Sequence, residues 1–327
     1  MSLPSVTVLL ASYNGGAYIQ EQLASVLASE GVTVNVVVRD DGSTDDTVVK
    51  AQSFGSRVTV IQRTELEPDY GHLANFSALC EHAKAHTNSD YYAFCDQDDI
   101  WFADKLVTLV DAIREIEDAG QTPALVHCDL QVVDADLQPL SESYWRYQGL
   151  PDPGQHRLDK LMYQNVVTGC ACLFNRALLN AATPVPNQAV VHDYWFALVA
   201  EAIGKVTFID KPLLAYRQHG ANSIGSVSFD DQRSYFKKFL YQMLWRFPGN
   251  LAASQRQAKA LLERFELEPS KCELLSRFAA FAQLGVFRRV QEGHRLLQTR
   301  QKSLGERLYL TVVFLMLPRE HKKGHKK

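Results

Sequence analysis

Apolar and polar positions alternate in two rhythms along the first hundred residues. Val6–Ala11 and Val34–Val38 are short apolar runs rich in β-branched side chains, a pattern typical of strands covered on both faces. Between them, apolar residues within Ile19–Leu27 recur at helical spacing, and Gly31 stands at the expected helix end. The chain is therefore predicted to begin with a strand, a helix and a second strand.

The same alternation continues to residue 95. A helix is predicted over Ser43–Phe54, because its first residue and Asp46 resemble a capping box. Val58–Ile61 and Tyr91–Cys95 are further strand patterns, with a helix predicted between them over Asn75–His86. Strands that alternate with helices imply an α/β protein with a mostly parallel, doubly wound sheet flanked by helices.

The pattern changes after the first hundred residues. An apolar stripe predicts a helix over Lys105–Ala119, whereas residues 138–165 are rich in Pro, Gly, Tyr and Gln and predict a long connecting segment. A helix is expected from near His192, followed by strands over Val206–Ile209 and Leu213–Gln218. From about residue 230 the chain is expected to be helical, with many Arg and Lys side chains.

Charge divides the chain in two. The 327 residues carry a formal net charge of −3, but residues 1–227 carry −14 and residues 228–327 carry +11. This length is typical of about two domains, and 46% apolar residues exclude a disordered chain. We expect a domain over 1–227 and a basic helical C-terminal region over 228–327, each with different partners.

The sequence shows no membrane span and no secretory signal. Its longest apolar run, Leu308–Leu317, is shorter than the roughly eighteen residues a spanning helix needs, and the N-terminus lacks a basic segment followed by an apolar stretch. We therefore expect a cytoplasmic protein. The six Cys are expected to be buried free thiols, and Cys170-x-Cys172 lacks the second pair of a structural zinc site.

Polar residues follow three of the predicted strands. They are Ser12–Gly16, Asp40–Ser43 and Asp96–Asp99. In an open parallel sheet, ligands bind outside the carboxyl ends of the strands. The third segment holds three carboxylates in four residues, which repel one another unless solvent or a hard divalent cation such as Mg²⁺ or Mn²⁺ relieves them. A metal site and a solvated acidic turn are both compatible with this spacing.

The second segment has two interpretations as well. A carboxylate there can accept a hydrogen bond from the ring N–H of uracil or thymine, and Gly42 permits close backbone approach. Alternatively, Asp40 or Asp41 caps a turn. The sequence lacks G-x-G-x-x-G and P-loop elements, which argues against a dinucleotide-binding oxidoreductase and a P-loop nucleotidase.

Together these motifs resemble family 2 glycosyltransferases. The resemblance rests on VTVLLASYN (6–14), DDGSTDDT (40–47), Asn75-Phe76 and DQDDIW (96–101), and it continues through Gly169-Cys170, HDYW (192–195) and YRQHGANSI (216–224). It implies the GT-A fold, a Rossmann-like sheet, with a nucleotide-sugar-binding half over 1–100 and an acceptor and catalytic half over 101–227. DQDDIW and YRQHG-x-N look most like the bacterial rhamnosyltransferase branch, whose usual donor is dTDP-L-rhamnose.

The resemblance also implies residue roles. Asp40 would bind the pyrimidine base, with Asp41 close by, and the residues lining the nucleotide pocket would be Ser12, Tyr13 and Asn14. Asp96 and Asp98 would contact ribose and a metal-bound diphosphate, a site that Asp99 and His219 would complete. Asp193 matches the catalytic base, although the preceding position, often Glu in the family, is His192 here.

The chemistry of an inverting transfer calls for these roles. A carboxylate must take the proton of the acceptor hydroxyl, and a cation must offset charge that develops on the leaving diphosphate. Local sequence leaves alternatives open, since Asp193 could instead be a helix N-cap. Arg217 could pair with phosphate or with a neighbouring carboxylate.

The acceptor side is predicted in less detail. Gly169 would allow close approach of the backbone to a sugar, and three aromatic residues could stack on sugar faces or belong to the core. These residues are Tyr144, Trp145 and Tyr147.

The basic C-terminal region suggests a surface partner. Leu308–Leu317 precedes a segment, Pro318–Lys327, that carries a net charge of +4, a combination that favours contact with anionic lipid at the inner face of the cell membrane. A helical cap or dimer surface is the second interpretation, and RNA binding the third. No nucleic-acid motif supports RNA binding, so no nucleic-acid partner is expected.

The sequence thus predicts an inverting, Mg²⁺- or Mn²⁺-dependent glycosyltransferase that acts on a glycan or lipid-linked acceptor in bacterial surface polysaccharide synthesis. The predicted donor is dTDP-rhamnose, and another UDP- or dTDP-hexose is the alternative. A sugar nucleotidyltransferase or a non-catalytic nucleotide-sugar-binding protein would share the sheet and the nucleotide site. A nucleotidyltransferase normally has a basic loop after its first strand, and Ser12–Gly16 contains no basic residue.

Overall fold

The computed structural model describes residues 3–64, 71–150, 153–155, 157–219, 247–281 and 284. These residues form two compact units. The first unit draws on 1–157, 165–185 and 191–229, and the second draws on 158–164, 186–190 and 230–327. The functional division of 1–227 into a donor half and an acceptor half stays a prediction.

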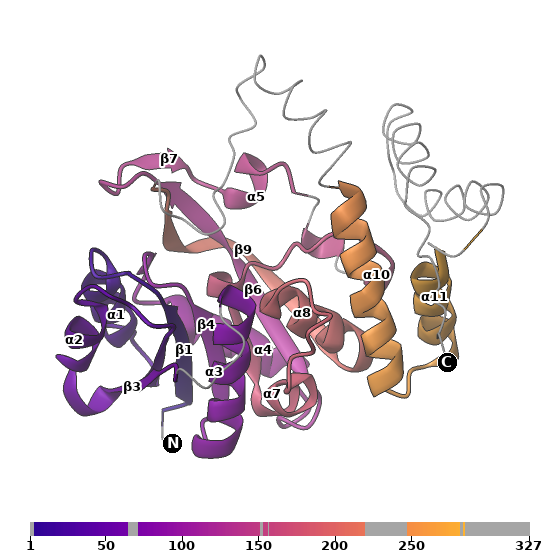
Figure 1. Cartoon of the computed structure of the whole chain (residues 1–327), viewed down its shortest axis with the longest axis horizontal. Helices are drawn as coiled ribbons and strands as arrows, with labels where there is room; N and C mark the ends of the chain where they lie inside the picture. The colour runs from indigo at the N-terminus through magenta and orange to yellow at the C-terminus, as the bar shows by residue number, and fades with distance from the viewer. Residues whose placement is uncertain are drawn as a thin grey trace, which may run out of the picture. The chain divides into compact units, whose positions relative to one another are not determined.

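The first unit contains a mixed sheet with helices on both faces (Figure 1). Its strands are β1 (Ser5–Ser12), β2 (Thr33–Asp40), β3 (Val58–Gln62), β4 (Tyr91–Cys95), β5 (Ile100–Trp101), β6 (Ala124–Val133), β7 (Pro139–Ser141), β8 (Cys172–Asn175) and β9 (Lys205–Arg217). Its helices of six residues or more are α1 (Ile19–Leu27), α2 (Thr47–Gln52), α3 (His72–His86), α4 (Lys105–Ile116), α7 (Arg176–Ala182) and α8 (His192–Ile203). These elements confirm the predicted α/β class.

Strand order places the predicted loops at one edge of the sheet. The order is β3-β2-β1-β4-β8-β6-β9-β5, with β7 paired to β6. The pairs β1–β2, β1–β4 and β2–β3 are parallel, so the carboxyl ends of β1, β2 and β4 lie together. The rest of the sheet mixes both directions, because β8 runs antiparallel to β4 and β6 whereas β9 runs parallel to β6.

Alternating side chains of the central strands build two apolar layers. Val6, Val8 and Leu10 of β1 belong to a core that also contains Leu23 of α1 and Leu109 of α4. On β4, Phe94 makes edge-to-face ring contacts with Phe76 of α3 and Phe196 of α8. Helices therefore cover the sheet on both faces, and burial of these side chains holds the loops at the strand ends in place.

Three predicted elements differ from the structure. The predicted capping box of Ser43 and Asp46 is wrong, because the Ser43 hydroxyl donates to Asp40 and α2 begins four residues later at Thr47. α3 begins at His72, three residues earlier than predicted. The two strands predicted at 206–209 and 213–218 are one strand, β9, whose register against β6 shifts near Pro212.

The predicted connecting segment, residues 138–165, contains short elements rather than a bare loop. They are β7, α5 (Tyr144–Tyr147), η2 (Pro153–Gln155) and α6 (Leu158–Leu161). The Ser143 side chain caps α5 by accepting a hydrogen bond from the Arg146 N–H.

The described part of the second unit contains α6, α10 (Phe247–Arg264) and α11 (Pro269–Ala280). Gln257 of α10 accepts a hydrogen bond from the Val190 N–H, and Tyr163 packs edge-on against Phe278 of α11. The segment 308–327, on which the predicted membrane contact rests, lies outside the described residues. Among the described residues, no helix combines the length and apolarity that a bilayer crossing requires.

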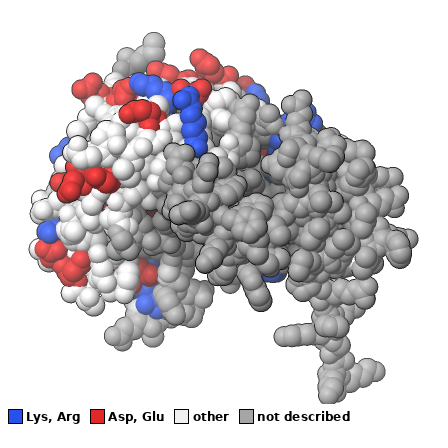
Figure 2. All heavy atoms as spheres, turned by 90° about the horizontal axis from the view of Figure 1, so that it is seen from above, with Lys and Arg blue, Asp and Glu red and all other residues white. Residues whose placement is uncertain are grey.

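Two predictions from composition can be compared with the structure. Acidic side chains are prominent over the described part of the face in Figure 2, in keeping with the negative net charge of residues 1–227. All six Cys are free thiols, and five of them are buried, whereas Cys272 is exposed.

Candidate active site

A cleft of about 720 Å³ opens where β1, β2 and β4 end. It is lined by the loops after these strands, by the segment 165–169 and by the start of α8. The predicted site residues that line it are Ser12, Tyr13, Asp41, Asp96, Asp98, Gly169 and Asp193. The other predicted site residues do not line it: Asn14, Asp40, Asp99, Arg217 and His219.

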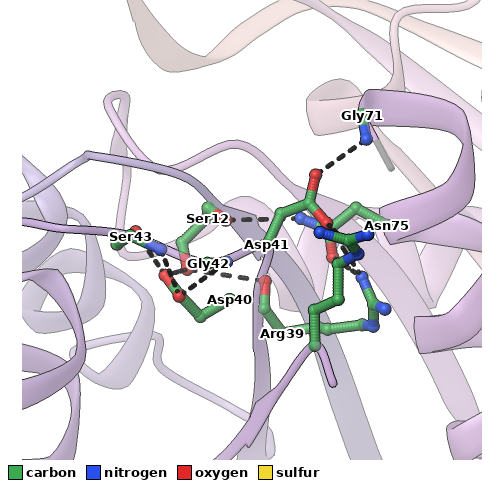
Figure 3. A network of polar contacts seen from close by, with 9 residues as sticks. Ser12, Arg39, Asp40, Asp41, Gly42, Ser43, Gly71 and Asn75 are labelled. Carbon is green, nitrogen blue, oxygen red and sulfur yellow. Dashed lines mark hydrogen bonds and ion pairs between the residues drawn. The ribbon is translucent and has the colours of Figure 1, made fainter. Parts of the chain in front are cut away.

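Asp40, at the end of β2, is used by its own turn (Figure 3). Its side chain accepts from the backbone N–H groups of Gly42 (3.1 Å) and Ser43 (2.8 Å), and from the hydroxyls of Ser43 and Ser12 (3.1 Å for Ser12). The residue is 1% exposed. Both oxygens are therefore committed to the protein, and the geometry corresponds to the turn-cap interpretation instead of the predicted contact with a base.

Asp41, unlike Asp40, is one of the residues that line the cleft, and its carboxylate points toward Gly71 (Figure 3). Its Oδ2 accepts a hydrogen bond from the Gly71 N–H (2.7 Å), and its Oδ1 lies 3.6 Å from Arg39 Nη1 and 3.9 Å from Arg63 Nε. Arg39 also donates to Asn75 Oδ1 (3.1 Å). This network holds Asp41 at the wall of the cleft.

The loop after β1 is braced by two amide side chains. Gln97 accepts from the Tyr13 N–H (2.9 Å) and donates to the Tyr13 carbonyl (3.2 Å). Asn14, which has a φ of 46°, donates its N–H to Ser43 Oγ and accepts from the Thr44 N–H. Asn14 thus joins the loops after β1 and β2. Gln97, which lines the cleft, joins the loops after β1 and β4, a role that the sequence analysis did not predict.

The acidic turn after β4 holds its three carboxylates in different surroundings. Asp96 is about one-third exposed, whereas Asp98 and Asp99 are buried. Asp98 Oδ2 lies 2.8 Å from His219 Nε2, and Asp99 Oδ1 accepts from the Arg217 N–H (3.2 Å). Burial and the charge of Asp96 raise the pKa of Asp98. Burial and the charge of Asp98 raise the pKa of Asp99 well above its usual range.

These acids fit a divalent cation. Ligand atoms of Asp96, Asp99 and Cys170 all lie within 4.8 Å of one another. A bound cation would relieve the repulsion that raises the pKa values of the buried acids, and carboxylate oxygens are ligands that Mg²⁺ and Mn²⁺ prefer. The four predicted metal ligands are therefore divided. Asp96 and Asp99 lie close enough to share a cation with Cys170, which was not predicted, whereas Asp98 and His219 are paired to each other.

Arg217 does not line the cleft, and its guanidinium is bonded within the protein. Its guanidinium donates to Glu21 (2.6 Å), to the Asp98 carbonyl (3.0 Å) and to the Ala135 carbonyl (3.1 Å). The side chain is 5% exposed. Of the two predicted roles, the pairing with a neighbouring carboxylate is the one formed, and it ties the acidic turn to α1 and β9.

Asp193, in the first turn of α8, is a cleft carboxylate whose pKa is raised. It accepts from Asn165 Nδ2 (3.0 Å) and from the N–H groups of Gly169 (2.8 Å) and Tyr194. Burial raises its pKa to about 6, against the lowering effects of His72 and of the two N–H groups. A carboxylate with this pKa is ionised at neutral pH and remains basic enough to take a proton.

Gly169 makes its close approach to protein side chains. A Cβ at this position would lie 2.8 Å from His192 Nε2 and 3.4 Å from Asp193 Oδ2. Its N–H reaches Asp193 because no side chain intervenes. The predicted approach to a sugar stays a prediction.

His72 is a cleft residue that the sequence analysis missed. It lies in the first turn of α3, with its Nε2 3.8 Å from Asp96 Oδ1 and its ring 5.1 Å from that of His192. Burial lowers the pKa of His72, but the surrounding charges of Asp96, Asp193 and Asp98 outweigh this and raise it. A lone His in a helical segment gives no sequence signal of this placement.

The three aromatic residues considered for sugar stacking differ in position. Tyr144 lines the cleft, where it contacts Tyr216 edge-on at 5.4 Å. Trp145 is 6% exposed and packs against His127 and Phe208, so it belongs to the core. Tyr147 does not line the cleft.

Known proteins are similar to this chain in sequence and in fold. The sequence model of "Glycosyl transferase family 2" matches residues 7–181. A solved structure of Staphylococcus aureus TarS 1–349 with UDP-GlcNAc superposes with a TM-score of 0.54 at 16% identity, covering 94% of this chain and 79% of that one. The fold and the cleft therefore define a GT-A glycosyltransferase. This chain belongs to glycosyl transferase family 2.

Two curated relatives are similar over most of the chain. The dTDP-rhamnosyl transferase RfbG of Shigella flexneri is 27% identical over 236 residues, 67% of this chain and 75% of the relative. The putative glycosyltransferase EpsH of Bacillus subtilis is 23% identical over 284 residues, 84% of this chain and 74% of that protein. The predicted family and enzyme class are thus confirmed.

Proposed function

We propose that this enzyme is an inverting, metal-dependent glycosyltransferase that moves a deoxyhexose, with L-rhamnose from dTDP-rhamnose as the leading candidate, onto a surface glycan. The observation that carries the proposal is Asp193: a carboxylate with a pKa of about 6 lines the same cleft as Asp96 and Asp98. A base and a diphosphate site in one cleft are what the transfer needs.

The nucleotide binds at the end of the cleft formed by β1 and β2. Asp41 accepts the ring N–H of a uracil or thymine base, and Arg63 lies beside it on the cleft wall. Tyr13, which is 57% exposed, offers a ring face next to this position. A pyrimidine donor fits this set, because a carboxylate pairs with the N–H that uracil and thymine share.

The diphosphate binds at the acidic turn. Asp96 and Asp99 would hold the cation together with Asp98, which His219 orients, and Cys170 lies within reach of the same position. When bound, Mg²⁺ or Mn²⁺ offsets the negative charge of the leaving nucleoside diphosphate. The residues themselves position the donor and keep its anomeric carbon on the Asp193 side of the cleft.

Asp193 acts as the general base. It takes the proton of the acceptor hydroxyl while the hydroxyl oxygen forms a bond to the anomeric carbon and the bond to the diphosphate breaks. Asn165 and Gly169 hold the carboxylate by donating to its two oxygens. Attack on the face opposite the leaving group inverts the anomeric centre.

The rhamnose donor is supported by two observations. RfbG, a relative of this chain, is a dTDP-rhamnosyl transferase. The cleft is also lined by Leu150, Val166 and Val167, whose apolar side chains suit the methyl group of a 6-deoxy sugar. A lipid-linked glycan at the cytoplasmic membrane face is the proposed acceptor, because residues 318–327 carry a net positive charge that anionic lipid would attract.

The test is a transfer assay with a panel of donors. The protein is incubated with Mn²⁺, an octyl glycoside acceptor and dTDP-rhamnose, UDP-glucose, UDP-GlcNAc or GDP-mannose, and NMR assigns the anomeric configuration of the product. We expect the fastest transfer from dTDP-rhamnose, with inversion. A product of retained configuration would contradict the mechanism, and preference for a GDP-sugar would contradict the assignment of the base site.

A further inference from the structure

One partly exposed side chain of the cleft wall has no role in the proposed mechanism. His72, at the start of α3, lines the cleft, and its side chain is 34% exposed. Its ring packs edge-on against Phe76, with centroids 4.9 Å apart, and tilts against the ring of His192 at 5.1 Å. Packing therefore holds the imidazole at the wall of the cleft, and about a third of the side chain stays accessible to a ligand.

The two ring nitrogens of His72 have different surroundings. Nδ1 is buried and has no hydrogen-bond partner among the described residues. Nε2 lies 3.8 Å from Asp96 Oδ1. The carboxylate attracts a proton on Nε2, so Nε2 carries the N–H of the neutral ring, and the protonated ring has an N–H there as well. Nε2–H is therefore the donor that His72 offers beside the acidic turn.

The separation of His72 and Asp96 suits a shared hydroxyl group. At 3.8 Å, Nε2 and Oδ1 are too far apart for a good hydrogen bond to each other. One oxygen atom can lie about 2.8 Å from both of them. A hydroxyl satisfies both atoms at once, because it accepts from the N–H and donates to the carboxylate. An ionised phosphate oxygen can only accept, so Asp96 would repel it.

The position of His72 along the cleft indicates which hydroxyl this is. His72 lies beside Asp96 of the acidic turn, where the diphosphate would bind, and its ring meets that of His192, the residue before the base. Burial lowers the pKa of His72, but the charges of Asp96 and Asp193 raise it, so both acids lie near the ring. In an inverting transfer, the sugar lies between the leaving diphosphate and the base. A group close to both therefore lies beside the transferred sugar.

We propose that His72 is a specificity-determining residue, whose Nε2–H donates a hydrogen bond to a hydroxyl of the donor sugar that itself donates to Asp96. The proposal rests on the proposed function and deepens it, since it assigns a side chain to the transferred sugar. A carboxylate has two oxygens, so this contact leaves the second oxygen of Asp96 for the cation. His72 neither gains nor loses a proton during transfer.

This contact separates the recognition of the sugar from that of the nucleotide. A site that hydrogen-bonds a hydroxyl discriminates against a ligand that lacks it, because the buried polar groups then stay unpaired. The nucleotide dTDP carries the base, the ribose and the diphosphate but not the sugar hydroxyl. Loss of the N–H of His72 should therefore weaken the binding of a sugar nucleotide and leave the binding of dTDP unchanged.

The test compares His72→Phe with His72→Gln. Phe retains a ring that can pack against Phe76 but has no N–H, whereas Gln can place an N–H near the position of Nε2. Calorimetry with Mn²⁺ and without acceptor measures the affinity for dTDP-rhamnose, UDP-glucose, dTDP and UDP. In His72→Phe we expect the affinity for the sugar nucleotide that the wild type binds best to fall about three- to tenfold. The affinity for the matching nucleoside diphosphate should stay within about twofold, and His72→Gln should recover part of the loss.

A histidine on the same helix provides the control. His86 of α3 is exposed and is not among the residues that line the cleft, so His86→Phe should leave all four affinities unchanged. Equal losses for dTDP and dTDP-rhamnose in His72→Phe would assign the contact to the nucleotide, and wild-type affinities would remove the contact. Either result would overturn the inference and leave the proposed function standing. A wild type that binds neither sugar nucleotide in the presence of Mn²⁺ would overturn both.

Discussion

The two ends of the cleft differ in how their carboxylates are satisfied. At the nucleotide end, Asp40 accepts four hydrogen bonds from Ser12, Gly42 and Ser43 and is closed off from ligands. At the reacting end, Asp98 and Asp99 are buried beside each other, and burial holds their pKa values and that of Asp193 above the usual range. The protein itself supplies the hydrogen-bond partners of Asp40, whereas a cation and substrates would supply the missing partners at the reacting end.

This difference distinguishes the acids that stabilise the loops from the acids that are available for binding and reaction. At the reacting end, buried acids have few partners for their negative charge. Such acids cluster at functional sites, because a bound cation or a transferred proton reduces the repulsion between them. The hydrogen bonds at the nucleotide end hold its loops in place, so in the proposed function Asp41 would meet the base without reorganisation. Substitutions at the two ends should therefore affect different measurements.

The largest effect is expected at the base. Asp193→Asn removes the proton acceptor and should lower kcat by about 100- to 10,000-fold, while dTDP affinity in the presence of Mn²⁺ stays near that of the wild type. Steady-state transfer and calorimetric titration measure the two quantities. Transfer at the wild-type rate would remove Asp193 from the mechanism.

The next effect concerns the support of the acidic turn. His219→Ala removes the hydrogen bond to Asp98 (2.8 Å) and should raise the Mn²⁺ concentration for half-maximal transfer by about 10- to 100-fold. His86→Ala, which replaces an exposed histidine on α3, is the matched control. An unchanged Mn²⁺ requirement in His219→Ala would show that His219 does not serve the metal site.

A pair of neighbouring substitutions separates the nucleotide site from its scaffold. Asp41→Asn should weaken dTDP binding about tenfold, because the amide offers one acceptor oxygen where the carboxylate offers two. Asp40→Asn should instead lower the free energy of unfolding by about 1–3 kcal/mol, since buried N–H donors lose an acceptor. Calorimetry measures the affinity for dTDP, and urea denaturation measures the free energy of unfolding. A loss of dTDP affinity in Asp40→Asn but not in Asp41→Asn would show that Asp40 contacts the base.

The smallest expected effect is a shift in pH dependence. Transfer should rise with pH through about 6, because Asp193 must lose its proton before it can act as the base. Asn165→Ala removes a donor to the ionised carboxylate, so the pKa of Asp193 should rise and the acid limb should move upward by about one pH unit. A profile of kcat/KM against pH measures this shift. A limb that stays in place would show that Asn165 does not stabilise the charge.

Local patterns were enough to predict the positions of the site loops. Apolar runs located β1, β2, β3 and β4, and the acids that follow them lie around one cleft, because parallel strands end at one edge. The family resemblance placed Asp193 at the start of a helix, where α8 begins. These features depend on residues near each other in the chain.

Long-range contacts decided the rest. Arg217 meets Glu21, which lies 196 residues away, and no local pattern could distinguish this partner from a phosphate. Asp40 and Asp41 are adjacent in sequence, yet Asp40 is enclosed by its own turn whereas Asp41 lines the cleft. The placement of His72 and His192 side by side in the cleft wall arises in the same way, from the packing of α3 against α8.

The most direct test of the central claim is a thermal-shift titration with dTDP-rhamnose, UDP-glucose and GDP-mannose, each with and without Mn²⁺. A ligand that binds the native protein raises its melting temperature, and the account predicts a rise with a pyrimidine nucleotide sugar that requires Mn²⁺ and disappears in Asp41→Asn. The account would be contradicted if none of these sugars changed the melting temperature. It would also be contradicted if a pyrimidine nucleotide sugar raised the melting temperature equally with Mn²⁺ and with a chelator.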